Sequence, residues 1–123
     1  MVEVKTATHP DCGKGLFAKC IFKRGEIISQ FTGRIVDPES KIAKQHYGWN
    51  VDLENGTYLN VFNGKGKAKF ANDANGLIKL GRNNSRIELS KGNAYLVASR
   101  TINPGEEVFV SYGKAYWNQL KHF

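Results

Sequence analysis

The sequence predicts a mainly β domain built from many short strands. Its apolar segments are short, and each is bounded by Gly, Pro, Asn or Asp, which are the residues that mark turns. Only one segment carries a complete helix pattern. With 123 residues, of which 41% are apolar, the chain is long enough for one core. We therefore expect one domain over residues 1–123, made of several small sheets and one or two short helices.

Strands are expected wherever a short apolar run lies between two turn signals. They are predicted at Val2–Lys5, Leu16–Ala18, Ile27–Phe31, Trp49–Leu53, Tyr58–Phe62, Ile87–Leu89, Tyr95–Ala98 and Val108–Val110. Two pairs should form hairpins. Asn55-Gly56 is the favoured pair for a tight primed turn, and Lys91-Gly92-Asn93 lies near the turn of "ELSKGNAYLV".

The helix signal lies in "VDPESKIAKQHY". Asp37 can cap the N-terminus, Pro38 suits the first helical position, and Glu39 favours the positive end of the helix dipole. The helix should end near Gln45. A second helical turn is expected after Gly113.

The charge of the chain suits an anionic partner. Eighteen Lys and Arg against eleven Asp and Glu give a formal net charge of +7. A basic β-domain that binds nucleic acid is therefore one candidate, with a footprint of Lys65, Lys67, Lys69, Arg82 and Arg86. It lacks the clustered aromatic residues of a stacking platform. The alternative reading is an ordinary basic surface.

The cysteines and the N-terminus bear on the compartment. Cys12 and Cys20 are the only cysteines, and their spacing is not that of a metal site, so no metal is expected. Isolated thiols are typical of an intracellular protein. No apolar run reaches the length of a membrane span, and the N-terminus lacks the apolar region of a secretory signal. We expect a protein of the nucleus or cytoplasm without membrane contact.

Three short motifs raise functional questions. "CGKGLFAK" has Ala18 where a dinucleotide-binding fingerprint needs its third glycine, so a dinucleotide site is excluded. Its two glycines then indicate either a simple turn or a place where the backbone closely approaches another small ligand. "KFANDANG", residues 69–76, gathers short polar side chains, as a surface turn or the wall of a ligand site would. Glu106 and Glu107 are adjacent in the sequence, and adjacent residues on a strand point to opposite faces, so their carboxylates cannot converge on one substrate atom.

Five segments, in this order, resemble SET-domain protein lysine methyltransferases. "GKGLFAKCIFKRGEII" is similar to the opening motif of that family, and "ISQFTGRIV" to the strand and glycine turn that follow it. "GKAKFANDANG" and "NNSRIE" resemble the two segments that meet at the knot-like crossing of the family. "VASRTINPGEEVFVSYG" resembles the segment that carries the catalytic tyrosine. The likeness runs from about Lys5 to Trp117, almost the whole chain.

The resemblance implies a β-clip fold with a knot-like C-terminal crossing and S-adenosylmethionine as cofactor. It gives Tyr112 as the catalytic residue. The cofactor-binding residues that it implies are Lys14, Gly15, Leu16, Asn72, Asp73, Tyr112 and Trp117. The candidate walls of the lysine channel are Phe31, Tyr58 and Tyr47. Asp73 replaces the histidine of the family motif, and Phe31 stands where many members have tyrosine. The zinc-binding segment that often follows the domain is absent, as in compact viral members.

The expected activity is methyl transfer to a lysine of a protein such as a histone tail, by a monomer or homodimer, in a host cell if the protein is viral. A SET fold that has lost catalysis and serves as a binding module is the alternative within the family. Histone tails are basic, and so is this chain. Three explanations are open: the groove is locally acidic, the substrate is not a histone tail, or the basic face holds nucleic acid beside the substrate. The candidate acidic residues are Asp52, Glu54, Asp73 and Glu88.

Overall fold

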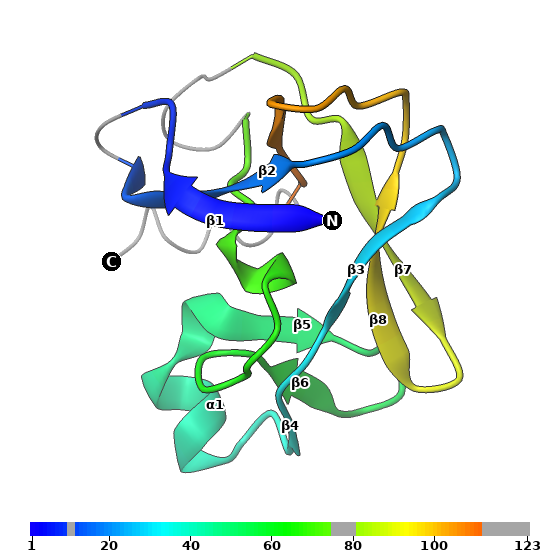
Figure 1. The fold of residues 1–123 in the computed structure, drawn as a ribbon. Coiled ribbons are helices and arrows are strands. Elements are labelled where there is room, and N and C mark those ends of the chain that lie inside the picture. The colour runs from blue at the N-terminus through cyan, green and yellow to red at the C-terminus, as the bar shows by residue number, and fades with distance from the viewer. Residues whose placement is uncertain (10–11, 75–80, 112–123) are drawn as a thin grey trace.

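Three small antiparallel sheets of three strands each make up the fold in a computed structural model, which describes residues 1–9, 12–74 and 81–111. The first sheet has the order β1 (Val2–Thr6), β2 (Lys14–Ala18), β9 (Glu107–Val108). The second has the order β3 (Ile27–Phe31), β8 (Asn93–Ala98), β7 (Ser85–Ser90). The third has the order β4 (Arg34–Val36), β6 (Tyr58–Asn60), β5 (Asn50–Asp52). Figure 1 shows the sheets as separate parts of one fold.

The predicted mainly β architecture is confirmed, with little helix in the described residues. The helical elements with described bounds are α1 (Lys41–Gln45), η2 (Tyr47–Trp49) and η3 (Ala68–Phe70). Strand β4 and the two 3₁₀ turns were not predicted. The helical turn expected after Gly113 lies outside the described residues. No described helix is long and apolar enough to span a membrane.

Helix α1 begins later than the sequence predicted. Its N-cap is Ser40, whose Oγ accepts a hydrogen bond from the Ala43 backbone N–H at 3.3 Å. Asp37 instead forms a separate turn: its Oδ1 accepts from the Glu39 N–H at 2.8 Å. Asp side chains readily bond the backbone two residues on, and this local bond competes with helix capping.

Both predicted hairpins form, with different turns. Between β7 and β8, Lys91 and Gly92 have φ values of 52° and 79°, as a two-residue primed turn requires. The β5–β6 turn is longer than expected. Leu53 N–H donates to the Thr57 carbonyl at 3.2 Å, and the positive φ values fall on Glu54 and Gly56. Asn55-Gly56 therefore lies inside a wider loop.

Two segments far apart in the sequence, residues 18–26 and 98–106, have matching backbone roles. Both begin with Ala and end with Gly-Glu, and their central residues Phe22 and Ile102 exchange two backbone hydrogen bonds of 2.9 Å. Each Gly N–H donates to the first carbonyl of the other segment, at 2.8 Å in both directions. Phe22 and Ile102 are both buried. This reciprocal pair joins the first sheet to the second, and the sequence prediction had recognised no such relation.

The C-terminal crossing is built around residues 107–110. Val110 N–H donates to the Asn72 carbonyl at 2.8 Å, and Ser85 N–H donates to the Phe109 carbonyl at 3.1 Å. The two contacts are parallel bridges, Asn72 with Phe109 and Ser85 with Val110. The segment therefore lies between two other parts of the chain, as the predicted knot-like crossing requires. The core around it includes the fully buried Leu16, Leu96, Ile102, Val108 and Val110.

Candidate functional site

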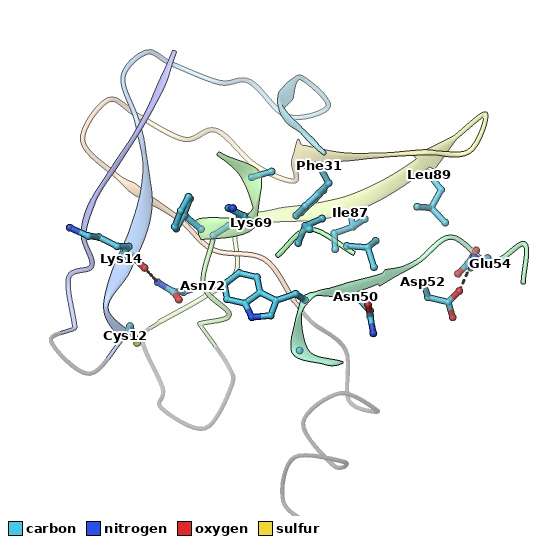
Figure 2. Close-up of a pocket in the computed structure, with 17 residues that line it drawn as sticks. Cys12, Lys14, Phe31, Asn50, Asp52, Glu54, Lys69, Asn72, Ile87 and Leu89 are labelled. Atoms are coloured by element: carbon cyan, nitrogen blue, oxygen red, sulfur yellow. Dashed lines mark hydrogen bonds between the residues drawn. The ribbon is translucent and has the colours of Figure 1, made fainter. Parts of the chain in front are cut away.

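A cavity of about 650 Å³ lies where the three sheets meet. This volume is within the range of sites for small molecules, about 300–1,000 Å³. Its walls come from distant parts of the sequence: Cys12, Lys14, Phe31, residues 48–52, Glu54, Val61, residues 68–72, Ile87 and Leu89. Figure 2 shows Lys14 and Asn72 at one end, Asp52 and Glu54 at the other, and Phe31 and Ile87 between them. We call these the Asn72 end and the Asp52 end.

Asn72 is held in place by hydrogen bonds on both its backbone and its side chain. Its carbonyl accepts from Val110 at the crossing. Its side-chain Nδ2 donates to the Lys14 carbonyl at 3.0 Å and to Glu107 Oε2 at 3.2 Å, which uses both amide hydrogens. Its Oδ1 has no partner among the described residues and can accept a hydrogen bond from a ligand.

Glu107 fixes the orientation of the Asn72 side chain. It is buried, and its Oε1 also accepts from the Thr8 N–H at 3.0 Å. A Cβ on Gly15 would lie 2.5 Å from Glu107 Oε2, so only glycine fits there without a shift. The sequence prediction treated Glu106 and Glu107 only as possible catalysts and missed this role. The alternation of side chains along a strand could have indicated it, because one of two neighbouring glutamates must then point into the protein.

Asn84 joins this end of the cavity to the crossing. Its buried side chain donates from Nδ2 to the Glu107 carbonyl at 2.9 Å and accepts on Oδ1 from the Phe109 N–H at 2.8 Å. These bonds satisfy two backbone groups on either side of Val108. Asn84 lies in "NNSRIE", one of the segments that the resemblance assigned to the crossing.

The other predicted cofactor residues have different places. Lys14 lines the cavity, whereas Leu16 is fully buried in the core opposite Val108. Asp73 is buried, and its Oδ1 accepts from Asn83 Nδ2 at 3.1 Å. Neither Leu16 nor Asp73 lines the cavity. The predicted Tyr112 and Trp117 lie outside the described residues.

The middle of the cavity is apolar. Phe31, a predicted wall, is buried at the end of β3 and lines it. Ile87 and Leu89 face it from β7, two residues apart and therefore on one face of that strand. The sequence prediction missed these two, because only the fold brings β7 to this wall. Of the predicted tyrosines, Tyr58 lies on β6 and does not line the cavity. Tyr47 belongs to η2, beside the lining residues 48 and 49.

The Asp52 end carries the acidic side chains. Asp52 is exposed, and its Oδ1 accepts from the Glu54 N–H at 2.8 Å (Figure 2). Glu88, another predicted acidic residue, does not line the cavity and forms an ion pair with Arg86 at 2.5 Å. Among the described residues, the cavity lining thus contains only two carboxylates, and both lie at this end.

The predicted nucleic-acid footprint is partly engaged within the chain. Lys67 Nζ donates to the Val2 carbonyl at 3.2 Å. Lys69 Nζ donates to the Gly64 carbonyl at 2.6 Å and to the Phe62 carbonyl at 3.1 Å. Arg86 is the partner of Glu88. Phosphate binding would therefore have to compete with these internal contacts.

The SET domain family profile matches residues 13–113. The chain belongs to the SET domain family. A comparison with curated proteins gives no match. Among solved structures, the similar ones include Polycomb Repressive Complex 2 chains, over 92–93% of this SET domain.

Two of these structures illustrate the likeness. A humanized mutant of the Chaetomium thermophilum complex, bound to an inhibitor, aligns with a TM-score of 0.71 and 23% identity. An active complex in the stimulated state aligns with a TM-score of 0.76 and 20% identity. This SET domain spans only about 15% of the length of each matched chain. At this identity the likeness establishes the fold.

Proposed function

We propose that this SET domain is an S-adenosylmethionine-dependent protein lysine N-methyltransferase. The observation that carries the proposal is a single cavity that joins three parts. The motif residues Lys14 and Asn72 lie at one end, the apolar walls around Phe31 in the middle, and an open strand edge at β5. A methyl donor and an extended peptide could reach a common point from two sides.

The Asn72 end suits the donor molecule. S-adenosylmethionine offers ammonium and amino N–H groups, and Asn72 Oδ1 is an acceptor fixed by the two bonds of its own amide nitrogen. Glycine at position 15 keeps side-chain atoms away from the Glu107 carboxylate, which fixes Asn72. The side chain is thus oriented before a ligand arrives, which lowers the entropy cost of binding.

The apolar walls suit the acceptor lysine. S-adenosylmethionine supplies an activated methyl group on a sulfonium centre. A free lysine has a pKa of about 10.4, and only its neutral amine can attack. Burial between Phe31, Ile87 and Leu89 would disfavour the ammonium form and lower that pKa. The proton can leave to water, so the chain contributes mainly by positioning an in-line approach. From the resemblance, Tyr112 would orient the amine near the positive sulfonium.

The edge of β5 suits a peptide. The Trp49 carbonyl accepts from the Val61 N–H at 2.9 Å, and Leu53 N–H donates to Thr57, so these alternate residues bond toward β6. In an antiparallel pair the intervening residues, Asn50 and Asp52, direct their N–H and C=O groups to the other side. Among the described strands, that side of β5 is the edge of its sheet. An extended substrate segment could add there as a further strand.

The first test is isothermal titration of the protein with S-adenosylmethionine. We expect micromolar-range binding that is lost in Asn72→Ala and retained in Asn93→Ala, an exposed asparagine on β8 outside the cavity. Methyl transfer is then screened on histones and cell extract, with Tyr112→Phe as the catalytic control. No binding by the wild-type protein would count against the proposal.

Two outcomes separate the alternatives. Cofactor binding without transfer to any protein would favour the inactive SET-fold binding module. Tight nucleic-acid binding with a steep salt dependence, and no cofactor binding, would favour the basic nucleic-acid-binding domain. A histone tail is the first substrate to try, because one similar structure is the Chaetomium complex bound to forms of histone H3.

A further inference from the structure

We propose that Asp52 and Glu54 select protein substrates that carry an Arg or Lys within a few residues of the methylated lysine. This inference rests on the proposed function and names a class of substrate for it. It assigns the two carboxylates as specificity-determining residues. They lie at the opposite end of the cavity from Asn72, and so away from the methyl donor (Figure 2).

The first support is that these carboxylates are not neutralised. Neither Asp52 nor Glu54 forms an ion pair with any residue that the structure describes. The bond that Asp52 makes to the Glu54 N–H uses one lone pair of Oδ1 and leaves its other oxygen available. Both residues belong to the β5–β6 hairpin, which places their two negative charges together.

The second support is that the other predicted acidic residues are already engaged. Glu88 alternates with Ile87 and Leu89 on β7, so its side chain lies on the face away from the cavity, paired with Arg86. Asp73 is buried and bonded to Asn83. The charge that a substrate would meet in the described part of the cavity is therefore that of Asp52 and Glu54, with Lys14 and Lys69 toward the Asn72 end.

The third support is independent of charge. The outward backbone groups of Asn50 and Asp52, which pair with no described strand, form the edge to which a substrate strand would add. Residues in a strand advance by about 3.3 Å each, so a peptide along β5 passes the carboxylates a few residues from the lysine. The apolar Val51 and Leu89 also line the cavity and can pack against the aliphatic stem of an Arg or Lys.

The net charge makes this local acidity significant. At +7, the chain as a whole repels basic peptides. For a peptide with an Arg beside its target lysine, attraction to the carboxylates at the Asp52 end would offset the repulsion from the net positive charge of the chain. A peptide with Glu at the same place would be disfavoured there.

The test compares peptides that differ in one charge. Each contains a single lysine in a Gly, Ala and Ser background, with Arg or Gln at one of the four positions on either side. Binding is measured by fluorescence anisotropy in the presence of S-adenosylhomocysteine, and kcat/KM by methyl transfer. The variant Asp52→Asn/Glu54→Gln removes both charges, and the amide oxygen introduced at position 52 can still accept from the N–H of position 54. The matched control is Glu88→Gln, which removes a charge from the face of β7 away from the cavity.

We expect the wild-type protein to prefer the Arg peptide at one or two positions by about three- to tenfold in Kd and kcat/KM. The double variant should lose this preference and its salt dependence, and Glu88→Gln should keep both. Equal affinity for Arg and Gln peptides in the wild type, or a preference that survives in the double variant, would overturn the inference alone. Absence of both cofactor binding and methyl transfer would overturn the proposed function and this inference with it.

Discussion

The two ends of the cavity are built in different ways. At the Asn72 end, buried or half-buried side chains form a connected network. Glu107 bonds to Asn72 and Thr8, Asn72 also bonds to Lys14, and Asn84 bonds to the backbone on either side of Val108. At the Asp52 end, exposed carboxylates stand on a hairpin loop whose contacts are local. The difference suggests that the first end is fixed for one invariant ligand. The second tolerates sequence change and is suited to a choice among substrates.

The largest effect is expected from breaking the crossing beneath the Asn72 end. Asn84→Ala leaves the Phe109 N–H and the Glu107 carbonyl buried without their partner. Each unsatisfied group costs about 1–3 kcal/mol, so we expect a loss of roughly 3 kcal/mol in the free energy of unfolding. Urea denaturation measures it. Asn93→Ala, on the exposed hairpin, should change stability by less than about 0.5 kcal/mol. Equal stabilities of the two variants would mean that the crossing does not depend on Asn84.

A smaller and more selective effect is expected at Glu107. Glu107→Gln keeps one oxygen for the Thr8 N–H but turns an NH₂ group toward Asn72 Nδ2, so two donors face each other. Asn72 should lose its fixed orientation, and affinity for S-adenosylmethionine should fall by about tenfold, or about 1.4 kcal/mol. Isothermal titration measures this loss.

The neighbouring carboxylate supplies the control for that experiment. Glu106→Gln changes the same chemistry in a turn, where Oε1 accepts from the Asn103 N–H at 3.0 Å. The Glu106→Gln variant should bind S-adenosylmethionine with the same affinity as the wild-type protein. Preference for Arg peptides should persist in Glu107→Gln, because the Asp52 end is separate. A parallel loss of that preference would show that the two ends are not independent.

Sequence predicted the local features better than the long-range ones. The Lys91-Gly92 turn follows from Gly92, which adopts positive φ readily, and Asn72 follows from a motif. Glu107 was missed because its role depends on Gly15, far away in the chain, whose missing side chain makes room for the carboxylate. Ile87 became a wall only because the fold brings β7 to the same cavity as β5. Asp37 was predicted to cap α1, but its side chain accepts a local bond from the Glu39 N–H, and Ser40 caps the helix instead.

A substitution at Phe31 should have only a small effect on stability, and it tests whether the two ends of the cavity act independently. This buried side chain lies between Asn72 and the Asp52 end. Phe31→Tyr adds a hydroxyl that could hold the substrate amine by a hydrogen bond and hinder its reorientation after the first transfer. We expect a shift toward monomethylated product, with a stability change of less than about 1 kcal/mol. Mass spectrometry of the peptide products measures the shift.

The matched substitution for Phe31→Tyr is Phe62→Tyr. Phe62 is exposed, stacks on His46 with ring centroids 3.9 Å apart, and does not line the cavity. Phe62→Tyr should therefore leave the proportions of mono-, di- and trimethylated product unchanged. If Phe31→Tyr also leaves it unchanged, Phe31 is only a packing residue of the core. A shift in product number without a change in Arg preference would instead place the control of methylation in the middle of the cavity. Substrate choice would then remain with the Asp52 end.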